Sequence, residues 1–113
     1  MYDYILKLIV EVPCAEGEKQ FTRINYQGKL RIGYSVQPSE GETVRITNLE
    51  TRKDIICTVQ KITHSFVRDH LNEDRWFFVS PEITLHVTIQ KVDFERLERE
   101  VILPSFDRIS NKS

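Results

Sequence analysis

Residues 83–91, ITLHVTIQK, alternate apolar and polar side chains without interruption, and residues 29–37, KLRIGYSVQ, follow the same pattern. Because successive side chains of a β-strand point to opposite faces, each segment has one apolar face and one polar face. Strands of this kind are typical of an antiparallel sheet that packs on one side only. The two segments therefore predict a mainly β fold.

Further segments have the composition of strands. They are residues 2–12, 43–48, 55–66 and 75–80, with residues 21–26 as a more ambiguous candidate. Within 55–66 the apolar positions change from odd numbers, ending at Val59, to even numbers, beginning at Ile62. A change of face inside one strand indicates a β-bulge, which we expect near Gln60 and Lys61 and which would bend the strand.

Three points are expected to interrupt these strands. Pro13 and Pro81 cannot donate a hydrogen bond to a neighbouring strand, so each is predicted to end a strand. Gln27-Gly28 is a candidate turn between the segments 21–26 and 29–37. The longest polar connection of the later part of the chain is expected over residues 67–74.

The hydrophobic period changes after residue 91. Phe94, Leu97 and Val101 are spaced by three and four residues, which places them on one stripe of a helix. The sequence predicts that this helix begins near Asp93 as its N-cap, ends before Pro104, and packs against the sheet through the apolar stripe.

Short strands followed by one helix predict the fold class. We expect a small antiparallel β-barrel or a strongly twisted sheet of about six to seven short strands, with one C-terminal α-helix. Residues 1–105 are predicted to form a single β-rich domain. Residues 106–113 are expected to form a short polar tail, in which Phe106 and Ile109 are the candidate anchors.

One hairpin resembles a known family. The stretch 41–46, GETVRI, a turn at Thr51, and then Val59 and Ile62 are similar to the central hairpin of pseudouridine-synthase-associated RNA-binding barrels and their ASCH relatives. The similarity covers only this hairpin and consists of turn and core residues. It implies a small barrel, and the N-terminal third departs from these families because it has no clear helix between its first strands.

Composition and cysteine content limit the class of protein. The chain has 113 residues, a formal charge of −1 and two cysteines, Cys14 and Cys57, which we interpret as small buried side chains in a reducing compartment. The N-terminus has no basic region or cleavage site of a signal peptide, and no apolar stretch is long enough for a transmembrane helix. We expect a cytoplasmic protein without membrane contact.

Charges are distributed unevenly along the chain. Residues 19–53 contain seven basic and three acidic side chains, whereas residues 69–107 contain four basic and nine acidic ones. The two regions are expected to attract each other within the fold. A basic surface that includes Lys29, Arg31 and Arg45 is an alternative, and it would bind RNA or single-stranded nucleic acid.

The stretch 64–76 is the strongest candidate for a functional surface. It holds two of the three histidines and the only tryptophan. Binding residues often lie on loops of rigid β scaffolds, and Trp and Arg often anchor interfaces. The candidate partner-binding residues are His64, Arg68, His70, Arg75 and Trp76. Trp76 has an alternative interpretation as a core residue, because it is flanked by Phe77 and Phe78. His86 is expected to be a solvated strand residue.

No catalytic motif is present. The glycines are too scattered for a phosphate-binding loop, and there is no GxSxG or HExxH sequence. No cofactor or metal site is predicted. The leading hypothesis is a non-catalytic small β-barrel binding module for a protein partner or a second copy of the chain. The alternatives are a nucleic-acid-binding barrel and a small enzyme that uses histidine and carboxylates around residues 64–76.

Overall fold

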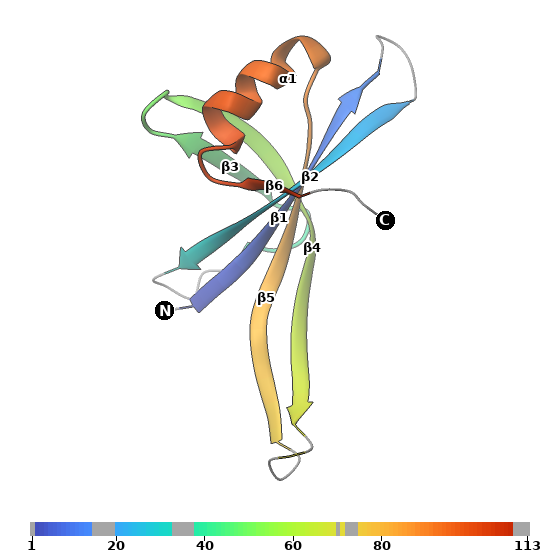
Figure 1. The fold of residues 1–113 in the computed structure, drawn as a ribbon, viewed down its shortest axis with the longest axis vertical. Coiled ribbons are helices and arrows are strands. Elements are labelled where there is room, and N and C mark those ends of the chain that lie inside the picture. The colour runs from blue at the N-terminus through green and yellow to red at the C-terminus, as the bar shows by residue number, and fades with distance from the viewer. Residues whose placement is uncertain (1, 15–19, 33–37, 70, 72–74, 110–113) are drawn as a thin grey trace.

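The computed structural model describes residues 2–14, 20–32, 38–69, 71 and 75–109 (Figure 1). Strands dominate this part of the chain, and one helical segment follows them. In chain order the elements are β1 (Tyr2–Pro13), β2 (Phe21–Ile32), β3 (Thr43–Asn48), β4 (Lys53–Asp69), β5 (Arg75–Thr88), α1 (Lys91–Leu97), a π-helical segment (Glu98–Ile102) and β6 (Asp107–Ile109). The prediction of a mainly β fold with one C-terminal helical segment is confirmed.

All six strands belong to one mixed sheet with the order β3-β4-β5-β1-β2-β6. Four of the five neighbouring pairs are antiparallel, but β1 and β5 run parallel, with Ile5–Glu11 beside Glu82–Thr88. The expectation of a purely antiparallel sheet is therefore wrong at this pair. Alternation of apolar residues reports which face of a strand is buried, and it carries no information about strand direction.

The sheet is open, because its first strand β3 and its last strand β6 are not neighbours in the strand order. Figure 1 shows strong twist between the strands, so that β1 and β2 cross the direction of β4 and β5. Of the two predicted architectures, the twisted sheet fits this structure. The barrel, and with it the architecture implied by the resemblance of the 41–62 hairpin, is not supported.

The core lies between one face of the sheet and the helical segment. Apolar side chains from β1, β2, β4 and β5 form its floor, and Val101, Ile102 and Phe106 cover it. The fully buried side chains of the largest volume are Tyr26, Leu8, Ile83, Leu85, Ile102, Val10, Val59, Val101 and Cys57. Cys57 is buried as expected, and burial raises the pKa of its thiol to about 12. Cys14 is exposed, contrary to the expectation, and both thiols are free.

Strand β2 runs through Gln27 and Gly28 without a turn, so the predicted turn is wrong. Gly28 has another role. A Cβ atom at this position would lie 2.9 Å from Cδ1 of Phe106 and 2.9 Å from the carbonyl oxygen of Ser105. Glycine is therefore required because the C-terminal segment crosses close over β2 here.

Strand β5 likewise continues through Pro81, which does not end it. The register between β4 and β5 shifts at two places, between Val59 and Lys61 and between Thr63 and Ser65. The first shift confirms the bulge predicted near Gln60. The second lies opposite Pro81, and a bulge accommodates proline because the local ladder hydrogen bond is already interrupted.

The helical segment packs as its sequence predicts. Phe94 and Leu97 are partly buried against the core and Val101 is fully buried, which confirms the apolar stripe. The helix begins at Lys91, with Gln90 as an N-cap that makes no side-chain cap hydrogen bond, so Asp93 lies in the first turn instead of at the cap. Its last turn is π-helical, with Leu103 N–H donating to the carbonyl oxygen of Glu98 at 2.8 Å.

Polar contacts attach the π-helical segment to strands near both ends of the strand order. The buried Tyr26 hydroxyl donates a hydrogen bond to the Glu98 carboxylate. Near β3, Asn48 Nδ2 and Thr51 Oγ1 both donate to the carbonyl oxygen of Glu100, at 2.7 and 3.1 Å. The wide π-turn leaves backbone carbonyls unpaired within the helix, and these side chains bind one of them.

The C-terminal segment 106–109 is part of the sheet. Phe106 is buried in the core, and Asp107–Ile109 pair antiparallel with Asn25–Gln27 as β6. The segment expected to be a polar tail thus supplies the edge strand beside β2. Phe106 acts as the anchor that the sequence analysis assigned to it.

We predict that the contact between Leu8 and Leu85 stabilises the junction of β1 and β5. These residues lie opposite each other and are fully buried. Leu85→Ala should lower the free energy of unfolding by roughly 2–5 kcal/mol in urea denaturation, because it removes buried methyl groups and leaves a cavity. The double variant with Leu8→Ala should show a non-additive coupling of about 0.5–3 kcal/mol. Ile56→Ala is the control, since Ile56 is 53% exposed on the same sheet. Additive losses would contradict a direct contact across this pair.

We also predict that Gly28→Ala destabilises the protein. At a strand position with free space around the Cα atom, replacing glycine by alanine usually stabilises a protein. At Gly28 the added methyl group must instead displace Phe106 or the backbone at Ser105. Thermal and urea unfolding should show a loss of about 1–3 kcal/mol. Gln27→Ala, at the exposed neighbouring position, should change stability by less than about 0.5 kcal/mol. A stabilised Gly28→Ala variant would show that the C-terminal segment does not cross β2 this closely.

Candidate functional site

The distal half of the β4–β5 hairpin projects from the rest of the molecule (Figure 1). Residues 65–69 of β4 pair with residues 75–79 of β5, and we call this two-stranded ribbon the arm. Strand β3 pairs with β4 only as far as Thr58, and β1 pairs with β5 only from Glu82 onward. Within the described chain no third strand flanks the arm. Isolated two-stranded ribbons are marginally stable in water.

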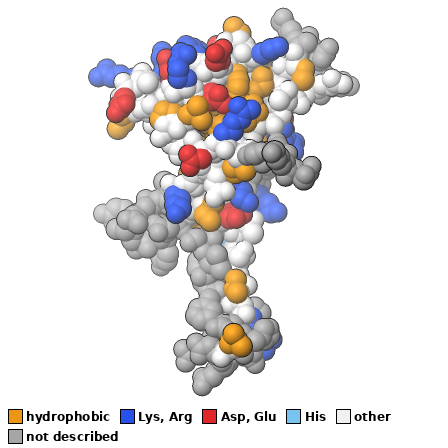
Figure 2. Space-filling view, viewed as in Figure 1, with side chains coloured by type: hydrophobic (Ala, Val, Ile, Leu, Met, Phe, Trp, Pro, Cys, Tyr) orange, Lys and Arg blue, Asp and Glu red, His pale blue; other side chains and the backbone are white. Residues whose placement is uncertain are grey.

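Apolar side chains on the arm face solvent. Phe66 is 61% exposed and its neighbour Val67 is 52% exposed. Because consecutive residues of a strand point to opposite faces, both faces of the ribbon present an apolar side chain. Leu71, beyond the end of β4, is also exposed, and Figure 2 shows hydrophobic atoms on the surface of this projecting end.

The predicted partner-binding residues fall on or beside the arm. His64 and Arg68 are exposed on β4. By backbone register, Trp76 lies opposite Arg68, and Arg75 lies opposite Asp69, while the side chains of Trp76 and Arg75 are outside what the structure describes. His70 lies outside the described residues altogether. The stretch was expected to be a polar loop from residue 67, but β4 extends to Asp69, so most of these residues lie on strands.

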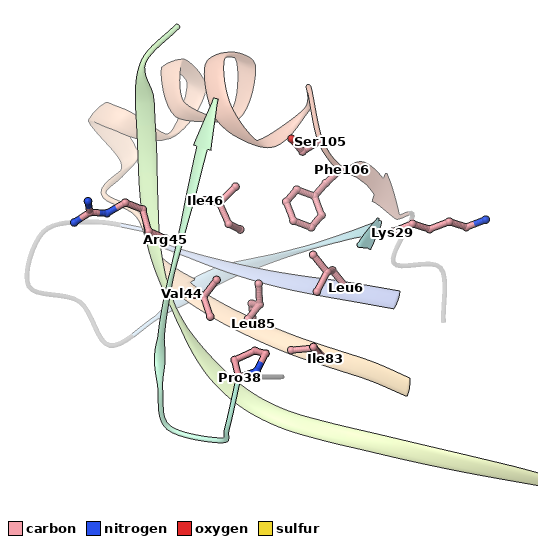
Figure 3. Close-up of a pocket in the computed structure, with 10 residues that line it drawn as sticks. All are labelled: Leu6, Lys29, Pro38, Val44, Arg45, Ile46, Ile83, Leu85, Ser105 and Phe106. Atoms are coloured by element: carbon pink, nitrogen blue, oxygen red, sulfur yellow. The ribbon is translucent and has the colours of Figure 1, made fainter. Parts of the chain in front are cut away.

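The three basic residues of the nucleic-acid alternative lie on two separate strands. Lys29 and Arg31 belong to β2, and Arg45 belongs to β3, at the other end of the strand order. Lys29 and Arg45 extend in opposite directions (Figure 3). Nε of Arg45 lies 3.7 Å from a carboxylate oxygen of Asp54. The side chain of Arg31 is outside the described set.

A charged cluster that the sequence analysis missed lies on the sheet face opposite the helix. Arg23 Nη2 donates to the Glu11 carboxylate at 2.9 Å, and His86 Nε2 lies 3.3 Å from the second carboxylate oxygen. The Arg23 hydrogen bond, and after it the His86 hydrogen bond, lower the pKa of Glu11 below its ordinary value of 4.5. His86 was expected to be a solvated strand residue, and it is instead partly buried beside a carboxylate.

The cluster depends on strand register. Glu11 lies opposite Arg23 on β2, and Ile9, two residues earlier, lies opposite His86 on β5. The three side chains come from three strands, so no local sequence pattern could identify them. Their mutual pairing across β2, β1 and β5 is typical of a contact that fixes register on an exposed sheet face.

A cavity of about 320 Å³ lies under the curled β3 edge of the sheet. In Figure 3 the side chains of Val44 and Ile46 point from β3 toward Leu6, Leu85 and Phe106. Several of these apolar side chains are only partly buried, because β3 curls over the core without closing onto β1. The alternation of Val44 and Ile46 with polar residues is consistent with their facing the same way, but it carries no information about a space between them and β1.

Two further findings concern the described part of the chain. Among these residues no group of three or more His, Cys, Asp and Glu side chains gathers in a geometry that could hold a metal ion. None of the described helices is long and apolar enough to cross a membrane. Comparison of the chain with known protein families, curated proteins and solved structures finds no match.

The Glu11 cluster makes stability dependent on pH. A carboxyl group whose pKa is lower in the folded state stabilises the fold above its unfolded pKa, and this contribution is lost as the pH falls through the lowered folded value. Glu11→Gln should therefore unfold at a lower urea concentration than the natural protein at pH 7. The difference should shrink steadily as the pH falls below 4.5. A difference that does not change between pH 7 and strongly acidic solution would contradict the ionic role of Glu11.

Proposed function

We propose that the protein is a non-catalytic binding module, and that the arm is the surface that receives a protein partner. The observation that carries this proposal is the exposure of Phe66 and Val67 on opposite faces of a two-stranded ribbon. Singly exposed apolar side chains are common on folded proteins, and Leu49 and Val92 are examples in this chain. Phe66 and Val67 differ because they are adjacent on a projecting ribbon, and clustered exposed apolar side chains mark interaction surfaces. A partner that encloses the ribbon would remove both side chains from water.

The polar residues of the arm support a protein as the partner. His64 and Arg68 are exposed on the same strand as Phe66 and Val67. A partner that contacts the two apolar side chains would therefore also meet polar side chains one or two residues away. Protein interfaces commonly combine an apolar centre with a polar rim that contains arginine. The partner is either another protein or a second copy of this chain, whose arm would offer the same two faces.

The arrangement of the basic residues gives less support to nucleic acid. A strand of nucleic acid is bound by cations that follow one continuous groove together with stacking rings. Lys29 and Arg45 extend in opposite directions and do not form one stripe (Figure 3). The two free cysteines fit a reducing compartment, so we propose the cytoplasm as the location of the binding module.

Site-specific photo-crosslinking in cells that make the protein tests the arm directly. A benzophenone amino acid replaces Val67 in one variant and Ile56 in the control, since both positions are on β4 and about equally exposed. We expect a light-dependent adduct with a discrete protein from position 67 and none from position 56. An adduct of twice the mass of the chain identifies a second copy as the partner. Equal adducts from both positions, or none from position 67, would refute the proposal.

Substitutions then measure the contribution of the apolar faces. The pair Phe66→Ser and Val67→Ser should weaken binding of the cross-linked partner by at least about tenfold, the usual effect of removing anchor side chains. Ile56→Ser is the matched control. The pair Arg68→Ala and His70→Ala tests the polar part of the arm in the same assay. Unchanged affinity of a folded Phe66→Ser, Val67→Ser variant would show that the arm is only a connection.

A further inference from the structure

The cavity under β3 has the lining of a small-molecule site and is separate from the arm. Its walls are formed by β1, β2, β3, β5, Pro38 before β3 and the segment that follows the helix. Most of its lining is apolar and comes from Leu6, Pro38, Val44, Ile46, Ile83, Leu85 and Phe106. Its volume of about 320 Å³ lies near the lower end of the range typical of small-molecule sites, roughly 300–1,000 Å³.

The charged residues at the walls identify the kind of molecule that fits. Lys29 and Arg45 contribute to the lining, but both side chains extend away from the enclosed space (Figure 3). Nε of Arg45, which lies 3.7 Å from a carboxylate oxygen of Asp54, is also outside the cavity. No charged side chain among those drawn points inward, so a charged group placed against these apolar walls would lose hydration without gaining a partner from them.

Among the described lining residues, Ser105 supplies the one neutral polar side chain. Ser105 lies at the rim, and it also borders the shallower hollow formed by Gln27, Gly28 and Arg108. Its hydroxyl can exchange one hydrogen bond with a ligand that has a single polar group. The opposite walls, from Leu6 on β1 to Val44 and Ile46 on β3, offer apolar contact alone.

We propose that this cavity binds one small, uncharged, mainly apolar molecule, with its single polar group at the Ser105 rim. Filling the space removes apolar walls from water and supplies dispersion contacts to them, and apolar cavities of smaller size bind apolar guests in other proteins. The proposal is independent of the arm, because none of the described lining residues belongs to the ribbon 65–69 and 75–79.

Three probes of equal chain length test the charge requirement: 1-octanol, octanoate and octylamine. Each is titrated into the full-length protein at pH 8 and followed by amide and methyl NMR shifts. We expect saturable binding of octanol with NOEs from its methylene protons to Leu85 and Val44, and a raised melting temperature. Octanoate and octylammonium should bind at least about tenfold more weakly because each must shed its hydration.

A pair of phenylalanine variants on β3 tests the location. Val44→Phe places a ring inside the cavity, whereas Thr47→Phe adds the same ring on the exposed alternate face of the strand. Val44→Phe should weaken octanol binding at least about tenfold, and Thr47→Phe should leave it within about twofold. If Val44→Phe does not fold, Ile46→Phe provides the same test from the other inward position.

Three results would overturn the proposal. The first is the absence of saturable octanol binding to the natural protein. The second is equal or tighter binding of octanoate, which would show that Lys29 or Arg45 receives a charged ligand. The third is NOEs to residues outside the cavity, or full octanol affinity in a folded Val44→Phe variant. Loss of crosslinking at the arm would affect none of these measurements, so the two proposals can fail separately.

Discussion

The parallel pairing of β1 with β5 is the contact on which the rest of the structure depends. It joins two antiparallel units, the β1–β2 hairpin with β6 on one side and the β3–β4–β5 meander on the other, into one sheet. Leu8 opposite Leu85, and Val10 opposite Val87, form the centre of the core floor. The helical segment has a continuous apolar surface to cover only because this pairing is in place. Without it, each three-stranded unit would expose its half of the apolar core to water.

The limited length of this pairing explains both proposed sites. Strand β5 has 14 residues, but β1 flanks it only from Glu82 to Thr88. The remainder of β5 has β4 as its neighbour, and the two strands leave the body as the arm. At the other end of the sheet, strong twist carries β3 over the core toward β1 without pairing with it. The space under β3 is the part of the core that neither strand fills.

Sequence reasoning succeeded where the signal is local and failed where it depends on distant contacts. The stripe Phe94, Leu97 and Val101 and the bulge at Gln60 follow from spacing within one element, and both were predicted. The parallel direction of β1 and β5 does not follow, because a period of two is the same in either direction. Gly28 was interpreted as a turn because its reason, the close crossing of Phe106, lies far along the chain. Stretch 64–76 was chosen for its unusual residues, yet Phe66 and Val67 went unrecognised, since a strand exposed on both faces has no periodic pattern.

Both proposed sites include residues of β5, but they differ in the number of strands that pair with β5 at that point. Ile83 and Leu85 line the cavity from the part of β5 that is paired on both sides, with β4 and with β1. Residues 75–79 pair with β4, and no other strand of the described chain flanks them; they lie beyond the irregularity at Pro81, where the β4–β5 register shifts. Opening the arm breaks hydrogen bonds of one strand pair, whereas reshaping the cavity floor disrupts the junction of the whole sheet. The free energy of local opening is therefore expected to be lower for the arm than for the cavity floor. In the two proposals, the arm is therefore the segment that would adapt its shape to a partner, and the cavity is the site whose shape would select its ligand.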